Sequence, residues 1–132
     1  MEEHTVITED GYILGMHRIP FGQNGSYNDG LTRPPVFLAH GVTSSSSQWV
    51  FGPPTKALGY LLADAGYDVW MGNTRGNTYS KAHVNLDTCS RCKEFWDFGF
   101  DETGVYDYSA EIDLILEVTG FEKLRFVGHS MG

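Results

Sequence analysis

The chain has 132 residues, of which 41% are hydrophobic and 14% aromatic, and this composition excludes a disordered or fibrous protein. Its formal net charge of −8 argues against a nucleic-acid partner, because a phosphate backbone needs a basic surface. No apolar run approaches the roughly 18 residues of a membrane-spanning helix, so we expect no transmembrane segment. We also expect no metal and no cofactor.

The first predicted element is a β-hairpin from His4 to Ile19. Two β-rich segments flank Asp10-Gly11, a dipeptide that favours a tight turn. A loop rich in Gly, Asn, Ser and Pro follows, from Pro20 to Pro35. Within it, Asn24 begins an Asn-Gly-Ser triplet, which has the form of an N-glycosylation acceptor. A three-residue pattern of this kind is a weak signal, and it matters only in a secreted protein.

Strands and helices are expected to alternate after this loop. Apolar runs at Val36–Ala39, Tyr67–Met71 and Leu124–Val127 predict strands that are buried on both faces of a sheet. Two helices are expected between them, the second of them capped by Asp101 and ended by Gly120. Their predicted apolar faces are Leu58, Leu61, Leu62 and Ala65 in the first helix, and Val105, Tyr108, Ile112 and Ile115 in the second.

The order of these elements predicts the α/β class. A hairpin followed by strand, helix, strand, helix and strand implies a parallel sheet with right-handed crossovers and helices on both faces. The sequence stops where a third helix is expected, directly after Gly132. We therefore interpret residues 1–132 as the N-terminal portion of a single α/β domain.

The residues from Gly128 to Gly132 match the G-x-S-x-G nucleophile elbow. In this motif the serine occupies a strained turn between a strand and a helix, and the flanking glycines allow the two elements to approach closely. An apolar strand ends directly at Gly128, as the motif requires. Ser130 is therefore the predicted nucleophile, and residues 1–132 are interpreted as the N-terminal portion of a single α/β-hydrolase domain, truncated at this nucleophile elbow.

An acyl-transfer site also needs two backbone N–H groups that stabilise the developing oxyanion. In this fold one belongs to the residue after the nucleophile and the other to a loop after an earlier strand. Met131 is the expected first donor, and Val42, in the segment His40-Gly41-Val42, is the expected second. We interpret the His40 side chain as a structural group that hydrogen-bonds this loop, since the triad histidine follows the serine in this fold.

Several ungapped segments resemble the acid lipase family, which includes gastric and lysosomal acid lipases. The resemblance covers nearly the whole chain. The segments that carry it are Glu3–Val6, Thr8–Leu14, His17–Pro20, Val36–Gly41, Leu62–Trp70, Gly72–Thr78, Glu94–Trp96 and Phe100–Glu102. In one departure, Met131 stands where these lipases usually carry Gln, and only its backbone N–H is needed for the oxyanion role. The segment from Cys89 to Cys92 also lies outside the family pattern.

The resemblance implies hydrolysis of neutral lipid esters, such as triacylglycerols or cholesteryl esters, at a lipid–water interface. It also implies a secreted or lysosomal protein. Met1 is followed by Glu2, Glu3 and His4 rather than by a basic and apolar leader, so a signal peptide is absent from these residues and would precede them.

The implied reaction is acyl transfer, in which a histidine removes the Ser130 proton and an acid orients the histidine. This fold orders its triad as Ser, then Asp or Glu, then His, yet only Met131 and Gly132 follow Ser130. We expect the acid and the base farther along a longer chain, and no catalysis by residues 1–132 alone. Two alternatives stay open: another α/β-hydrolase activity (an esterase or a peptidase) and a non-catalytic fragment that binds lipid or a partner.

Two further features are more simply structural. Cys89 and Cys92 form a C-x-x-C pair in a predicted loop, where a local disulfide, a redox pair or half of a zinc site are all conceivable, and an incidental or structural role is favoured. Arg75 follows a predicted strand at the edge of the sheet where sites occur. We expect it to brace the loop through an ion pair or backbone hydrogen bonds.

Overall fold

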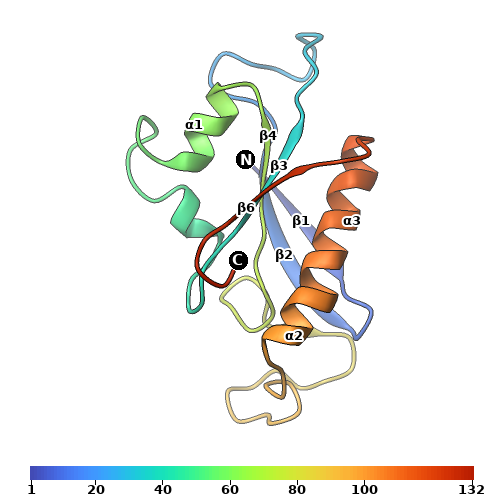
Figure 1. Cartoon of the computed structure of the whole chain (residues 1–132). Helices are drawn as coiled ribbons and strands as arrows, with labels where there is room; N and C mark the ends of the chain where they lie inside the picture. The colour runs from blue at the N-terminus through green and yellow to red at the C-terminus, as the bar shows by residue number, and fades with distance from the viewer.

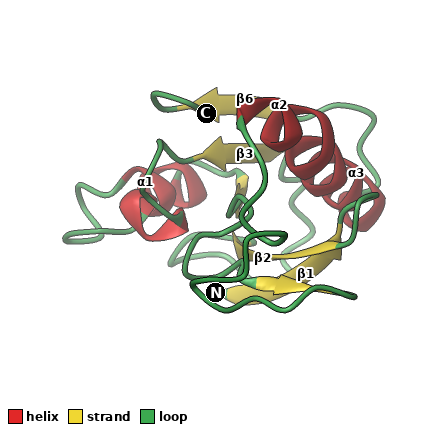
Figure 2. Ribbon diagram, turned by 90° about the horizontal axis from the view of Figure 1, so that it is seen from below, coloured by secondary structure: helices red, strands yellow, loops and turns green.

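The computed structural model describes all 132 residues and contains one mixed β-sheet with helices against both faces (Figures 1 and 2). The strand order is β1-β2-β4-β3-β6, and a two-residue strand, β5, pairs with β2 at the side. The strands are β1 (Glu2–Ile7), β2 (Tyr12–Ile19), β3 (Pro35–Ala39), β4 (Asp68–Met71), β5 (Ala82–His83) and β6 (Arg125–Gly128). The predicted α/β class and the three predicted parallel strands are confirmed.

The β1–β2 hairpin is confirmed with an antiparallel register that pairs Glu2 with Arg18 and Ile7 with Ile13. Gly11 has a φ of +93°, a conformation that favours glycine, and its N–H donates to the Thr8 carbonyl at 3.0 Å. The turn chemistry at Asp10-Gly11 therefore determines where the chain reverses.

The centre of the sheet is buried on both faces. Val36 and Leu38 of β3 pack with Val69 and Met71 of β4 on the side that carries the first helix. Phe37 and Trp70, which alternate with them along these strands, pack against the helix on the opposite side. This alternation explains why continuous apolar runs, rather than apolar–polar alternation, mark these strands in the sequence.

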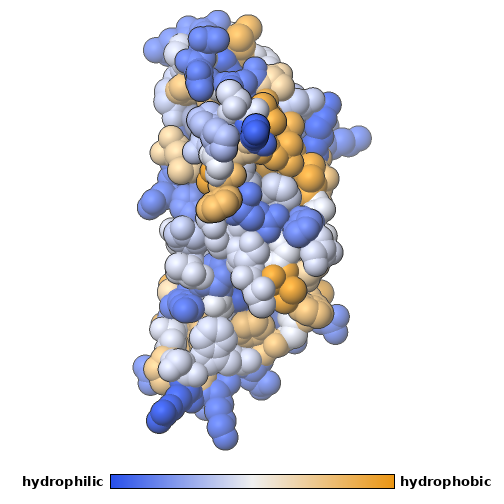
Figure 3. Space-filling view, turned by 90° about the vertical axis from the view of Figure 1, so that its left-hand side faces the viewer, coloured by the Kyte–Doolittle hydropathy of each residue, from blue (hydrophilic) through white to orange (hydrophobic).

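A short helix covers the first of these faces. It comprises α1 (Leu58–Asp64), preceded by a 3₁₀ turn, η1 (Ser46–Trp49). The predicted apolar face was wrong: Leu58, Leu61 and Ala65 are exposed, Leu62 is half-buried, and the buried positions are Gly59 and Ala63. Gly59 lies directly against Trp49 and Val50. The helix therefore packs through close approach of its backbone rather than through large apolar side chains. The face of the molecule that carries α1 shows hydrophobic patches among hydrophilic residues (Figure 3).

The opposite face is covered by one continuous helix that is built from three segments. They are α2 (Phe100–Glu102), a π-helical turn, η2 (Thr103–Asp107), and α3 (Tyr108–Thr119). The predicted Asp101 cap was wrong, because the N-cap is Gly99, whose N–H donates to Glu102 Oε2 at 2.7 Å. The predicted end at Gly120 is confirmed, with a left-handed φ of +72°.

The π turn explains a second correction to this helix. The Tyr108 N–H donates to the Thr103 carbonyl five residues earlier, so the turn holds an extra residue and rotates the face that follows. Val105, predicted on the buried face, is exposed instead. The fully buried positions are Thr103, Asp107, Glu111 and Ile115.

The last strand, β6, lies at the edge of the sheet next to β3. The predicted burial of this strand on both faces is wrong: its residues from Arg125 to Gly128 are exposed, because β6 is at the sheet edge and pairs only with β3, with Phe126 in register with Phe37. None of the helices has the length and hydrophobicity that crossing a lipid bilayer requires.

Candidate active site

The elbow at the end of β6 has the geometry that its sequence predicts. Ser130 is exposed and has a φ of +60°, a conformation that costs free energy for any residue with a side chain. A Cβ atom on Gly128 would overlap the Gly132 carbonyl, and one on Gly132 would overlap the Ala39 carbonyl. Both glycines are therefore needed for the turn to close against β3.

The loop after β3 lies directly against this elbow. The His129 N–H donates to the Ala39 carbonyl at 3.0 Å, and a Cβ atom on Gly41 would lie 3.2 Å from the Ser130 Cβ. A side chain at Gly41 would therefore crowd the elbow. The left-handed residue of this loop is Thr43, with a φ of +59°. Thr43 and Ser130 are the only non-glycine residues with positive φ in the chain, so backbone strain is concentrated at this one place.

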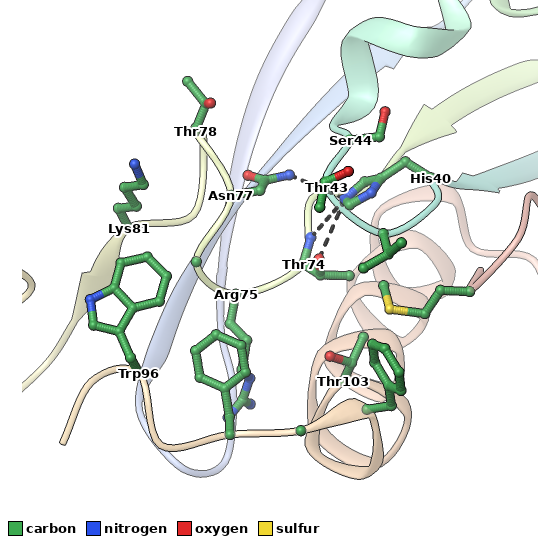
Figure 4. A pocket seen from close by; sticks show the side chains of 16 residues that line it. His40, Thr43, Ser44, Thr74, Arg75, Asn77, Thr78, Lys81, Trp96 and Thr103 are labelled. Atoms are coloured by element: carbon green, nitrogen blue, oxygen red, sulfur yellow. Dashed lines mark hydrogen bonds between the residues drawn. The ribbon is translucent and has the colours of Figure 1, made fainter. Parts of the chain in front are cut away.

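A pocket of about 650 Å³ opens beside the elbow, at the carboxyl ends of β3 and β4 (Figure 4). Val42 and Met131, the two predicted oxyanion donors, both line it, whereas Ser130 is not among its lining residues. The hydrophobic residues that line the pocket include Trp96 and Phe98, and Lys81 is its one lysine. The pocket is therefore partly apolar, and it is lined by both residues that are predicted to donate to the oxyanion.

The His40 side chain is buried behind this loop and is fully hydrogen-bonded (Figure 4). Its Nε2 accepts from the Thr74 N–H at 3.2 Å, which leaves the proton on Nδ1, and Nδ1 donates to the Gly41 carbonyl at 2.8 Å. Burial lowers the pKa of His40, an effect that its hydrogen bond to Gly41 only partly opposes. His40 is consequently a neutral side chain that connects the loop after β3 to the loop after β4.

None of the histidines forms a hydrogen bond with the Ser130 hydroxyl. His4 is paired with Glu2, His17 with Ser46, and His83 with the Asp10 carbonyl. His129 precedes the nucleophile in the elbow and has no side-chain hydrogen bond. The residues present therefore place the predicted nucleophile near the two predicted donors, and no histidine side chain is hydrogen-bonded to Ser130.

Arg75 braces the loop after β4, and this prediction is confirmed. Its guanidinium is buried and forms ion pairs with Asp10, at 2.6 Å, and with Asp107, at 2.7 Å, while it stacks on Tyr12 at 3.9 Å. Burial alone would lower the pKa of Arg75, but the two carboxylates raise it above its usual value. This cation is an internal crosslink and is not free to bind a substrate.

Sequence reasoning missed two buried polar residues next to the pocket, Asn73 and Glu111. The Asn73 N–H donates to Glu111 Oε1 at 2.9 Å, and both residues are completely buried. The other carboxyl oxygen, Oε2, has no partner. Burial raises the pKa of Glu111 to about 8 despite the Asn73 hydrogen bond, so its neutral form is favoured below that pH. For Glu111 the signal in the sequence was the four-residue spacing of Thr103, Asp107, Glu111 and Ile115, and for Asn73 it was its place in the family-like segment Gly72–Thr78.

The remaining predicted positions lie away from the pocket. Cys89 and Cys92 are joined by a disulfide with a Cα–Cα distance of 5.1 Å, and no cysteine is free. Asn24 is exposed in the loop between β2 and β3. No group of three or more His, Cys, Asp or Glu side chains is arranged to hold a metal ion.

Comparison with known proteins agrees with this geometry. A family model described as the partial alpha/beta-hydrolase lipase region matches residues 1–52, and one for the alpha/beta hydrolase fold matches residues 34–132. The chain is 51% identical to mouse gastric triacylglycerol lipase and 50% identical to human lysosomal acid lipase/cholesteryl ester hydrolase, in each case over 99% of this chain and 32% of the relative. It thus spans about a third of the length of these relatives.

Among solved structures, an esterase from Pyrococcus furiosus superposes with a TM-score of 0.62 and 20% identity, over 99% of this chain and 42% of the esterase. At that identity the match supports the fold alone. The resemblance to acid lipases inferred from the sequence is confirmed by the relatives above. The family model that covers residues 34–132 establishes that the chain belongs to the α/β-hydrolase family.

Proposed function

We propose that this chain provides the nucleophile and the oxyanion hole of a serine hydrolase that cleaves neutral lipid esters, either triacylglycerols or cholesteryl esters. The observation that carries the proposal is the strained Ser130, whose φ of +60° holds it beside Gly41 at the edge of the pocket lined by Val42 and Met131. Residues 1–132 would then form the N-terminal portion of one hydrolase domain, whose acid and base come from residues that follow the elbow.

The reaction follows from this arrangement. Ser130 Oγ attacks the ester carbonyl, and the carbonyl oxygen becomes an oxyanion that accepts hydrogen bonds from the Val42 and Met131 N–H groups. These donors belong to backbone that is already fixed by packing, so little reorganisation is needed as the charge develops. The apolar part of the pocket wall, which includes Trp96, suits an acyl chain better than a polar group.

The names of the relatives also support a secreted or lysosomal setting and action at a lipid–water interface. In that setting the exposed Asn24 would be glycosylated and the Cys89–Cys92 disulfide would persist. Both properties follow from the compartment and are independent of catalysis.

The test uses the full gene product with emulsified triolein, cholesteryl oleate and a soluble p-nitrophenyl ester as substrates. Ser130→Ala should lower kcat at least a thousandfold on every substrate, because the nucleophile is lost. The same variant should lose labelling by a fluorophosphonate. Ser109→Ala, which removes an exposed serine from α3, is the matched control and should leave kcat unchanged.

Three outcomes would contradict the proposal. Ester turnover that survives Ser130→Ala would place the nucleophile elsewhere. A wild-type protein that cleaves peptide anilides and no lipid ester would favour the peptidase alternative. Lipid binding without turnover or fluorophosphonate labelling would favour a non-catalytic role.

A further inference from the structure

The polar atoms of Asn73, on the loop directly after β4, are all hydrogen-bonded although the residue is completely buried. Its backbone N–H donates to Glu111 and its carbonyl accepts from the Ser80 hydroxyl at 2.8 Å. Its side-chain Oδ1 accepts from the Ser46 N–H at 2.8 Å and from the Asn77 amide at 2.8 Å. Its Nδ2 donates to the Gly15 carbonyl at 2.8 Å and to the Ser46 hydroxyl at 3.1 Å.

These bonds connect Asn73 to both ends of the loop that carries Val42. At the far end, Ser46 begins the 3₁₀ turn η1, and both its N–H and its hydroxyl are bonded to the Asn73 side chain. At the near end, the connection to His40 runs through Asn77, which donates to Asn73. The Asn77 Nδ2 lies 3.1 Å from His40 Nε2. The N–H of Thr74, the residue after Asn73, donates to the same His40 nitrogen. The five residues between these two anchors, 41–45, include the strained Thr43.

The other partners of Asn73 belong to rigid elements. Gly15 is in the middle of β2, and Glu111 is on the buried face of α3. Glu111 receives a backbone N–H, so it fixes the path of the chain at Asn73, while the Gly15 carbonyl fixes the orientation of the side-chain amide. A strand, a helix and two loops are thus joined through one residue.

We propose that Asn73 is a positioning residue for the oxyanion hole, holding the loop from Gly41 to Ser46 at both ends so that the Val42 N–H faces the reacting carbonyl. It acts through Ser46 and, with Asn77, through His40, and it does not touch the pocket. This inference rests on the proposed function, because the loop has an oxyanion to stabilise only if Ser130 is the nucleophile.

The kinetic test compares Asn73→Ala with a matched variant at the other end of β4, in the full gene product. Asn73→Ala should lower kcat for a soluble p-nitrophenyl ester ten- to a hundredfold and leave KM within threefold, because a misplaced donor is felt mainly in the transition state. The control is Asp68→Asn, which disturbs a buried ion pair with Arg18 at the opposite edge of the sheet. It should lower the Tm while leaving kcat within twofold.

A second variant covers the case in which Asn73→Ala does not fold. Asn77→Ala removes the contact with His40 but keeps the bonds from Asn73 to Ser46, so its loss in kcat should be smaller, about three- to tenfold. Either variant should weaken a trifluoromethyl ketone inhibitor by the same factor as kcat/KM. The tetrahedral adduct of that inhibitor with Ser130 carries the oxyanion, so it reports on the donors directly.

Hydrogen exchange separates this inference from the proposed function. In Asn73→Ala the amides of residues 41–46 should exchange at least tenfold faster than in the wild type, while Asp68→Asn should leave them unchanged. A wild-type protein without esterase activity would overturn the proposed function, and the exchange result would still report on the loop. Unchanged exchange in residues 41–46, or an unchanged kcat in an active enzyme, would overturn the positioning role of Asn73.

Discussion

Two neighbouring polar regions each bury a carboxyl group of the same helix, but the two carboxyl groups have different partners. Asp107, in the π turn, meets the Arg75 guanidinium at 2.7 Å and also accepts the Arg75 N–H at 2.8 Å. Glu111, four residues later in α3, receives one N–H from Asn73 and has one oxygen without a partner. Both side chains are completely inaccessible to solvent.

The difference shows that burial by itself does not decide the charge of an acid. Burial raises the pKa of Asp107 as well, but the hydrogen bonds and the Coulombic attraction of Arg75 oppose that shift. Glu111 lacks a cation, so burial raises its pKa to about 8. One region is therefore a charged crosslink between the hairpin turn and the helix, and the other is a neutral hydrogen-bonding core.

The largest effect should come from removing the cation. Arg75→Met would leave Asp107 buried without its partner and should lower the free energy of unfolding by about 3–5 kcal/mol. Equilibrium urea unfolding at pH 7 measures this loss. Arg75→Lys is the matched variant, and its loss in the free energy of unfolding should be intermediate. One ammonium group cannot replace a planar guanidinium that donates to both Asp10 and Asp107. A loss below about 1 kcal/mol for Arg75→Met would show that the crosslink contributes little.

A smaller effect, and one that depends on pH, is expected at Glu111. Its folded-state pKa of about 8 lies above 4.5, the ordinary pKa of a glutamic acid in an unfolded chain, so between these two pH values the folded state binds one more proton. The contribution of Glu111 to the free energy of unfolding is fully present below pH 4.5 and is lost as the pH rises toward 8. Between these values the folding equilibrium constant falls about tenfold for each pH unit. Glu111→Gln keeps the acceptor for Asn73 and should abolish this slope.

Unfolding curves of the wild type and Glu111→Gln at pH 5 and pH 8 test the comparison. The variant should gain stability over the wild type as the pH rises. Glu117→Gln removes an exposed carboxyl group from the same helix and is the control. A difference between wild type and Glu111→Gln that is the same at both pH values would mean that Glu111 is ionised in the folded protein and has a partner after all.

The elements and the elbow could be predicted because their causes are local. A continuous apolar run such as Val36–Ala39 fits a strand that is covered on both faces, and the elbow depends on five adjacent residues. The same reasoning located the helix from Phe100 to Thr119 and placed Tyr108, Ile112 and Ile115 on its packed side, but it also placed the exposed Val105 there and missed the buried polar positions. Apolar periodicity assumes that buried positions are apolar, and here three of the four fully buried positions are polar.

The two polar regions could not be predicted in this way, because their partners are distant in the chain. Asp107 is 32 residues from Arg75, and Glu111 is 38 residues from Asn73. No local pattern encodes such pairings, and the π turn further changes which side of the helix faces the sheet. Local motifs thus predict the nucleophile and the donors, whereas the polar residues next to them lie on segments that are distant in the sequence.

The smallest effect is expected at Tyr108, a third polar group on the helix and the one with the fewest partners. Its hydroxyl is buried without any hydrogen bond, while its ring packs edge-on against Phe37 and Phe126. Tyr108→Phe keeps the ring and removes an unsatisfied group, so the free energy of unfolding should stay constant or rise by up to about 1 kcal/mol. Tyr12→Phe is the matched control, since the Tyr12 hydroxyl donates to the Phe95 carbonyl, and it should cost about 1 kcal/mol. Equal losses in the two variants, measured by urea unfolding, would mean that the Tyr108 hydroxyl has a hydrogen-bond partner in solution.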